Sequence, residues 1–184
     1  MKKLLMAAGV APFALIATTA HAGETAQEDL LISATVLPEC SLADLAPVDF
    51  GTLAINTAAG PDALLLTGDR QDSGQQAWTS CNYAATITIE GQPMQNQDQD
   101  NTGPDQGDFT DQLNYRITWR SDNGNDFLQA NLRTVNATTV TRAQTGAFHN
   151  NAIINTALVT EDQGGLRPLS GTYTATATLS LGAI

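Results

Sequence analysis

Residues 170–181 constrain the fold more than any other segment, because apolar and hydroxyl-bearing side chains alternate along them. The positions that fall on one face are Tyr173, Ala175, Ala177, Leu179 and Leu181. This period of two is the pattern of a β-strand with one face against a core. Because the sequence supplies no later segment to pair with it, we expect an edge strand. A free edge is a template for another chain.

Shorter alternating runs rich in Thr, Val, Ile and Ala recur along the chain, separated by clusters of Gly, Pro, Asn and Asp. No stretch has the 3.6-residue apolar period of a long helix. The sequence therefore predicts an all-β fold, a β-sandwich rather than a parallel α/β sheet. Strands are expected over residues 30–36, 48–55, 63–66, 78–81, 84–90, 113–120, 135–143, 152–160 and 172–181.

Two polar segments are expected to lie between strands. Residues 123–124, Asn-Gly, tolerate the positive φ of a tight hairpin and predict a turn after the 113–120 strand. Residues 93–111 predict a long surface loop. Part of this loop, residues 98–108, begins like a calcium-binding loop, but Phe109 stands where the EF-hand pattern needs glutamate. A solvated loop without a metal is the favoured interpretation.

The first 22 residues have the organisation of a secretory signal peptide. Lys2 and Lys3 form a basic start, residues 4–18 an apolar core and residues 20–22 a small-x-small cleavage site. We expect residues 1–22 to be removed on export, and the remaining 162 of 184 residues suit one domain. Loss of the two lysines takes the formal charge from −11 to −13, which disfavours nucleic acid as a partner.

Cys40 and Cys81 are the two cysteines of the chain. In an exported protein an even number of cysteines favours a disulfide over free thiols. Closing a loop of about 40 residues stabilises a fold by about 4 kcal/mol on the chain-entropy estimate. A metal site is the alternative, but His149 is the only histidine left after the expected cleavage.

Groups that could carry catalytic chemistry are few. After the expected cleavage the chain has no lysine and one histidine, and it has no Gly-x-Ser-x-Gly motif. Glu161 and Asp162 form a carboxylate pair and keep a secreted hydrolase open as an alternative, although a polar stretch does not favour a raised carboxyl pKa. We expect no enzymatic activity and no cofactor. Trp78 and Trp119 are expected in strands, in core or cross-strand packing rather than as ligand platforms, and His149 is expected to lie in a loop.

Four motifs follow one another along the expected mature chain. Residues 32–40 alternate and lead into the first cysteine, and residues 48–53 contain Asp-Phe-Gly. Residues 78–81 end a strand at the second cysteine, and residues 171–173, Gly-Thr-Tyr, open the final strand. In order and spacing these motifs resemble the spore coat U domain family, which includes the pilin-like subunits of archaic chaperone–usher pili.

The resemblance implies an immunoglobulin-like sandwich that lacks its last strand and therefore has an apolar groove. A strand of a periplasmic chaperone fills the groove temporarily, and the N-terminal extension of the next pilin subunit then replaces it, a form of β-augmentation. The implied function is structural and adhesive, in a surface pilus. The implied partners are identical or related pilin subunits, a periplasmic chaperone and an outer-membrane usher.

For this chain the resemblance implies an N-terminal extension over residues 23–37 and a pilin-like domain over residues 38–184. A donor strand needs an apolar side chain at every second position. Such positions are Leu30, Ile32, Ala34 and Val36. The alternative is that this segment is the domain's own first strand, in a non-polymerising secreted coat or carbohydrate-binding protein.

Overall fold

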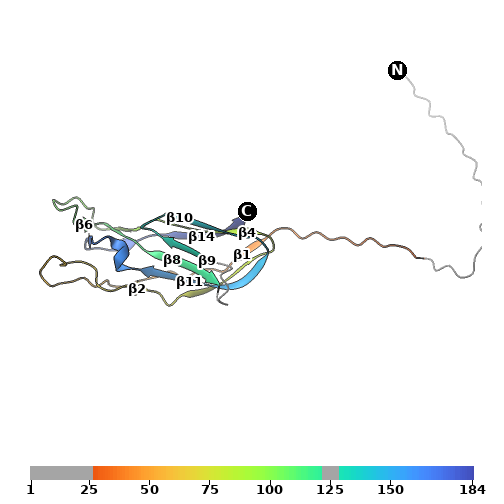
Figure 1. Cartoon of the computed structure of the whole chain (residues 1–184), viewed down its shortest axis with the longest axis horizontal. Helices are drawn as coiled ribbons and strands as arrows, with labels where there is room; N and C mark the ends of the chain where they lie inside the picture. Colours follow the sequence, from red (N-terminus) through yellow and green to blue (C-terminus); the bar gives the residue numbers. More distant parts are fainter. Residues whose placement is uncertain (1–26, 122–128) are drawn as a thin grey trace, which may run out of the picture. The chain divides into compact units, whose positions relative to one another are not determined.

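The computed structural model describes residues 27–121 and 129–184. It divides into two units, Met1–Val36 and Leu37–Ile184. The expected signal peptide and the expected Asn-Gly turn at 123–124 lie outside the described residues. Within them the chain contains strands and one short 3₁₀ helix and no α-helix, which confirms the all-β fold (Figure 1).

The larger sheet has six strands, and five of them form one continuous path. The path runs through β1 (Cys40–Leu42), β3 (Gln75–Cys81), β11 (Phe148–Leu158), β8 (Arg116–Ser121) and β9 (Gln129–Arg133). The sixth strand, β2 (Arg70–Gln71), pairs with the end of β11. All of these pairings are antiparallel, and β1 lies at one edge of the sheet.

The second layer is built from shorter sheets. Strands β10 (Thr139–Gln144), β4 (Ala85–Gly91) and β14 (Ala177–Ala183) form one, and β13 (Tyr173–Thr174), β5 (Met94–Asn96) and β7 (Gln112–Leu113) form another. Strands β6 (Phe109–Thr110) and β12 (Arg167–Pro168) form a parallel pair. The 3₁₀ helix η1 (Thr160–Gln163) follows β11.

The core lies between β4 on one side and the larger sheet on the other. Ile87 and Ile89 of β4 are completely buried and belong to one cluster with Trp119 of β8 and Leu132 of β9. Burial alternates along β4 and β8, as expected when one face of each strand packs inward. Each large side chain in such a core contributes about 1.5–3 kcal/mol through burial.

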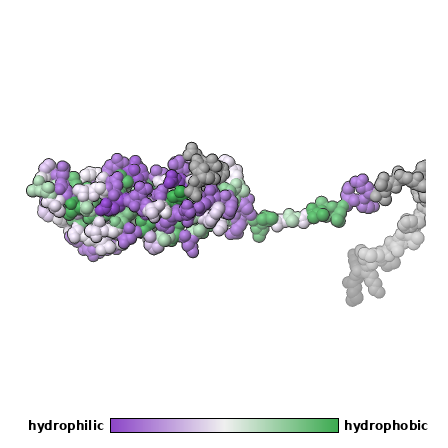
Figure 2. Space-filling model, turned by 90° about the horizontal axis from the view of Figure 1, so that it is seen from below, coloured by the Kyte–Doolittle hydropathy of each residue, from purple (hydrophilic) through white to green (hydrophobic). Residues whose placement is uncertain are grey.

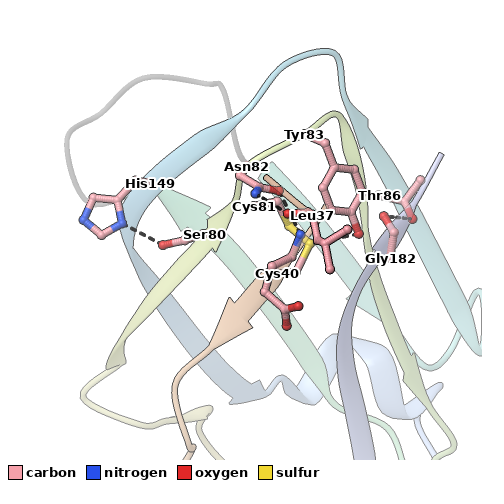
Figure 3. The surroundings of a disulfide bond; sticks show 10 residues. Leu37, Cys40, Ser80, Cys81, Asn82, Tyr83, Thr86, His149 and Gly182 are labelled. Carbon is pink, nitrogen blue, oxygen red and sulfur yellow. Dashed lines mark hydrogen bonds between the residues drawn. A yellow bond between two sulfur atoms is a disulfide. The ribbon is translucent and has the colours of Figure 1, made fainter. Parts of the chain in front are cut away.

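The Cys40–Cys81 disulfide is confirmed, with an S–S distance of 1.98 Å. The two cysteines are direct partners in the pairing of β1 with β3. Beside them, the Asn82 side chain donates to the Leu37 carbonyl and accepts from the Glu39 amide, both at 2.8 Å (Figure 3). The disulfide and this side chain together hold residues 37–40 against Cys81 and Asn82.

The expectation of one continuous strand over 172–181 is wrong. The segment divides into β13, which pairs with β5, and β14, which pairs with β4, while Ala175 and Thr176 belong to neither. The interruption lies opposite the residues between β4 and β5, which include Pro93. Proline has no N–H and cannot donate to a ladder, so the pairing breaks there.

Other expected strands also differ from the structure. Residues 30–36 form no strand. The strands expected over 48–55 and 63–66 are also absent, and these two segments share only one β-bridge, between Ile55 and Leu66. The expected 113–120 strand divides into β7 and β8, and the 135–143 strand begins only at Thr139. Strand β11 begins at Phe148 and contains His149, which is therefore not a loop residue. Hydrophobic alternation indicates a strand-like segment but does not supply its partner.

Candidate functional site

A large open groove, with a volume of about 1110 Å³, lies within the unit Leu37–Ile184. One wall is formed by residues 45–53, and the opposite wall by residues 168–177 with Leu179. Side chains from the larger sheet line it between these walls, among them Ile117 and Leu158. Its lining is mainly apolar, and includes Leu45, Val48, Phe50, Leu53, Met94, Leu113, Tyr173, Ala175 and Ala177.

The groove leaves the apolar face of β14 only partly covered. The inward side chains of the neighbouring strand β4 are fully buried, with Ile87 and Ile89 at 0% exposure. Leu179 and Leu181, which pair with them in the same sheet, are only partly buried, and Ala175 is exposed. Adjacent strands of one sheet face the same core, so the difference shows that packing is incomplete along β14.

The hydrogen bonding between backbone strands is also incomplete on both sides of the groove. In the described chain β14 pairs with β4 on one side only, and β1 pairs with β3 on one side only. Residues 43–54 lie outside any strand, although the Gln75 side chain donates to the Ala46 carbonyl at 2.8 Å and accepts from its amide at 2.7 Å. Unpaired N–H and C=O groups along such edges can accept another strand.

The predicted donor residues lie in an extended segment that is exposed throughout. Residues 27–39 form no strand, and the exposed fractions of Leu30, Ile32 and Val36 are 84%, 83% and 83% (Figure 1). Ala34 is exposed as well. Figure 2 shows hydrophobic residues concentrated along this segment. Isolated surface apolar residues are common, but a contiguous apolar segment is typical of an interaction site.

The two members of the carboxylate pair lie in different environments, and the pKa of Asp162 is not raised, as expected from the sequence. Glu161 is exposed, whereas Asp162 is buried and accepts hydrogen bonds from the Arg116 and Arg133 guanidinium groups. The Arg116 Nε–Asp162 Oδ2 distance is 2.5 Å. Hydrogen bonding from Arg116 lowers the pKa of Asp162 below its ordinary value of 3.8, against the opposing effect of burial. An ionised, doubly paired carboxylate is suited to holding β8, β9 and η1 together and is unsuited to donating a proton.

The acidic loop is held by hydrogen bonds within it and to residue 172. Asp98 accepts from the Thr172 amide at 2.7 Å, and the Asn101 side chain donates to the carbonyls of Gln106 and Phe109. In residues 27–121 and 129–184 no group of three or more His, Cys, Asp or Glu side chains could hold a metal ion. Over the same residues no helix is long and apolar enough to span a membrane.

The two tryptophans occupy opposite environments. Trp119 is fully buried, as expected for a residue that packs within a strand. Trp78 is 55% exposed, and its ring stacks on the His149 ring with 4.7 Å between the ring centroids. The outward orientation of Trp78 could have been predicted from the sequence. Trp78 and Cys81 are three positions apart along β3, so their side chains lie on opposite faces of the strand, and Cys81 faces inward.

Comparison of the chain with protein-family models, with curated proteins and with solved structures finds no match in any of the three. The groove, its two open edges and the exposed N-terminal segment are therefore the features from which a function is inferred.

Proposed function

We propose that the chain is a structural subunit of a surface pilus, assembled head to tail by donation of a strand. In this proposal residues 30–36 of one copy enter the groove of the next copy and pair with the free edges beside it. The observation that carries the proposal is the presence, in one chain, of an unfilled apolar groove and an exposed segment with strand alternation. The resemblance of the four sequence motifs to pilin-like proteins points the same way.

The dimensions of the two parts agree. The segment Leu30–Val36 would span about 23 Å as a strand, at about 3.3 Å per residue. The wall formed by residues 168–177 with Leu179 is longer than this, so the whole segment can lie along it. Every second side chain of the donor would point into the groove, while the others would face solvent. Leu30, Ile32, Ala34 and Val36 would form the inward set.

The energetics also favour insertion. Burial contributes about 1.5–3 kcal/mol for each large aliphatic side chain, so Leu30, Ile32 and Val36 together contribute several kcal/mol. New hydrogen bonds to the two edges of the groove offset part of the entropy lost when the segment is fixed. The donor would also cover the partly buried side chains of β14, which gain packing at the same time.

The contact proposed here joins two different surfaces of the same chain. Heterologous contacts that do not close into a ring generate open filaments. Before assembly the same groove would be occupied by a strand of a periplasmic chaperone, and an outer-membrane usher would carry the subunit to the cell surface. An immunoglobulin-like strand order with one strand missing belongs to this proposal. The role requires neither catalysis nor a cofactor.

Cysteine cross-linking between copies tests the proposal. Both native cysteines are already paired, so an added thiol on each of two variants reports their proximity. Copies with Ala34→Cys mixed with copies with Ala177→Cys or Ala175→Cys are expected to form disulfide-linked dimers. Ser33→Cys is the matched control and should cross-link far less, because its side chain would face away from the groove.

The same variants separate the proposal from its alternative. If residues 30–36 serve as the domain's own first strand, a chain with both Ala34→Cys and Ala177→Cys will cross-link within a monomer. The mixture of single variants will then give no dimer, and the proposed strand donation is wrong.

A further inference from the structure

The outer face of the larger sheet has a chemical character that strand donation does not use. None of its six strands contains an aspartate or a glutamate, although the chain has 19 acidic residues. Its outward positions on β3, β8, β9 and β11 carry mainly amide, hydroxyl and guanidinium groups around one exposed indole, that of Trp78. Among the described residues the carboxylates of Glu161 and Asp162 in η1 pair with Arg116 and Arg133 on this face, and Arg116 lies opposite Ala157, six residues along β11 from the position opposite Trp78.

The indole of Trp78 is held in place by its neighbours. Its ring lies nearly parallel to the His149 ring, with an interplanar angle of 14°. The His149 Nδ1 atom is in turn 2.7 Å from the Ser80 hydroxyl, and Figure 3 shows this pair on adjacent strands. Stacking on a ring that is itself hydrogen-bonded restricts the rotation of the indole, so less entropy is lost when a ligand binds.

Trp78 is 55% exposed, so part of the indole remains available to a ligand. In the pairing of β3 with β11, Trp78 lies opposite Asn151, so its two diagonal neighbours on β11 are His149 and Ile153. His149 stacks on the indole from the side of the first neighbour, and Ile153 and Gln76, which are paired across the strands, lie on the other side of Trp78 in the register. Gln76 is exposed, and its amide can both donate and accept hydrogen bonds.

We propose that this face is a carbohydrate-binding platform centred on Trp78, and that its ligand is a flat, β-linked pyranose oligosaccharide. The C–H groups on one side of a pyranose ring are attracted to the electron-rich face of an indole. The hydroxyl groups at the ring edge need partners that donate and accept, which Gln76 and the neighbouring amides provide. Arg120, exposed and beside Ile153 in the sheet, adds donors.

Other ligand classes fit less well. A cationic ligand could stack on the indole, but no strand of this sheet supplies a carboxylate to pair with it. An apolar protein partner would leave the amides of this face buried without hydrogen bonds, which costs free energy. The platform is independent of the proposed strand donation, since Trp78 does not line the groove.

Tryptophan fluorescence of the full chain provides the test. Because Trp119 is fully buried, a change in emission or in quenching by acrylamide on adding sugar reports Trp78. The probes are cellohexaose and chitohexaose, with maltohexaose, whose α-linked chain is curved, as the comparison. We expect a saturable change with at least one β-linked probe and a weaker one with maltohexaose.

Substitutions test whether Trp78 is the residue that binds the sugar. Because Trp78→Ala removes the fluorescent reporter, the affinity of each variant is measured by calorimetry. Trp78→Ala should weaken binding by roughly tenfold or more, since aromatic stacking and its buried area are lost. Val135→Ala changes another exposed apolar residue and should leave binding unchanged. Thermal unfolding of each variant confirms that it is folded. Absence of binding to both β-linked probes, equal binding by Trp78→Ala, or preference for maltohexaose would overturn the proposal.

Discussion

The substitution Ile32→Asn should abolish the joint between subunits without affecting the domain that carries it. In the isolated chain Ile32 is 83% exposed and lies in no strand. A change at such a position alters the stability of a fold by no more than about 0.5 kcal/mol. When both are compared as monomers, the wild-type and Ile32→Asn chains are therefore expected to unfold at the same denaturant concentration.

The effect on assembly is much larger, because Ile32 becomes buried only in the groove of a neighbour. Loss of the aliphatic side chain removes about 1.5–3 kcal/mol of burial. An amide left without partners in an apolar groove costs a further 1–3 kcal/mol, approximately. The sum, about 2.5–6 kcal/mol, corresponds to a joint weaker by roughly 10² to 10⁴-fold.

Ser33→Asn is the matched control, since it introduces the same side chain one position along the segment. Its side chain would face solvent in the proposed joint, so fibres should form as in the wild type. Sedimentation velocity and electron microscopy of the mature chain measure the outcome. Equal polymerisation of the two variants, or equal loss in both, would refute the assignment of the inward face. A marked loss of stability in monomeric Ile32→Asn relative to the monomeric wild type would refute the donor role itself.

Three further predictions concern the domain. Asp162→Asn should destabilise it by about 3 kcal/mol, because Arg116 and Arg133 lose a buried partner. Since the pKa of Asp162 is lowered in the fold, this stabilisation is complete above the ordinary value of 3.8 and is lost as pH falls through the lower folded value. Urea unfolding from pH 7 to pH 2 should show the gap between wild type and variant closing only below about pH 4; a constant gap would contradict the ion-pair account. Replacing both Cys40 and Cys81 by alanine should cost about 4 kcal/mol, given their separation of 41 residues. An unchanged unfolding midpoint in the alanine variant would show that the disulfide does not constrain the unfolded chain. Gly91→Ala should cost about 1–3 kcal/mol, because its new Cβ would lie 2.4 Å from the buried Tyr115 hydroxyl and 3.3 Å from Leu132. Thermal unfolding measures it, with Gly103→Ala, where a Cβ meets nothing within 4 Å, as the control that should be unaffected.

The sequence was most informative about features that depend on one local segment of the chain or on composition. Alternation identified most of β3, β4, β8 and β11, and the even number of cysteines identified the disulfide. Alternation was misleading about the extent of a strand wherever its hydrogen bonding depends on a second, distant segment. The strand expected over 172–181 breaks opposite Pro93, and the segment 30–36 has the alternation of a strand but no partner within the described chain.

Long-range contacts explain what was missed. Asp162 is adjacent in sequence only to other polar residues, whereas its partners Arg116 and Arg133 lie 46 and 29 residues away. No local sequence pattern predicts these ion pairs, although they connect the segment after β11 to β8 and β9. The groove was expected only through resemblance, since its walls, residues 45–53 and residues 168–177 with Leu179, come from opposite ends of the domain.

Amide hydrogen exchange tests most directly whether the domain lacks a strand that another chain can supply. The full Ile32→Asn chain, which should remain monomeric, is measured with and without a peptide comprising wild-type residues 27–38. We predict rapid exchange at the free-edge amides of residues 45–53 and 175–181 in the monomer, and marked slowing at both when the peptide is present. If these amides are already protected in the monomer, or if the peptide leaves their exchange unchanged, the domain is complete in itself and strand donation is wrong.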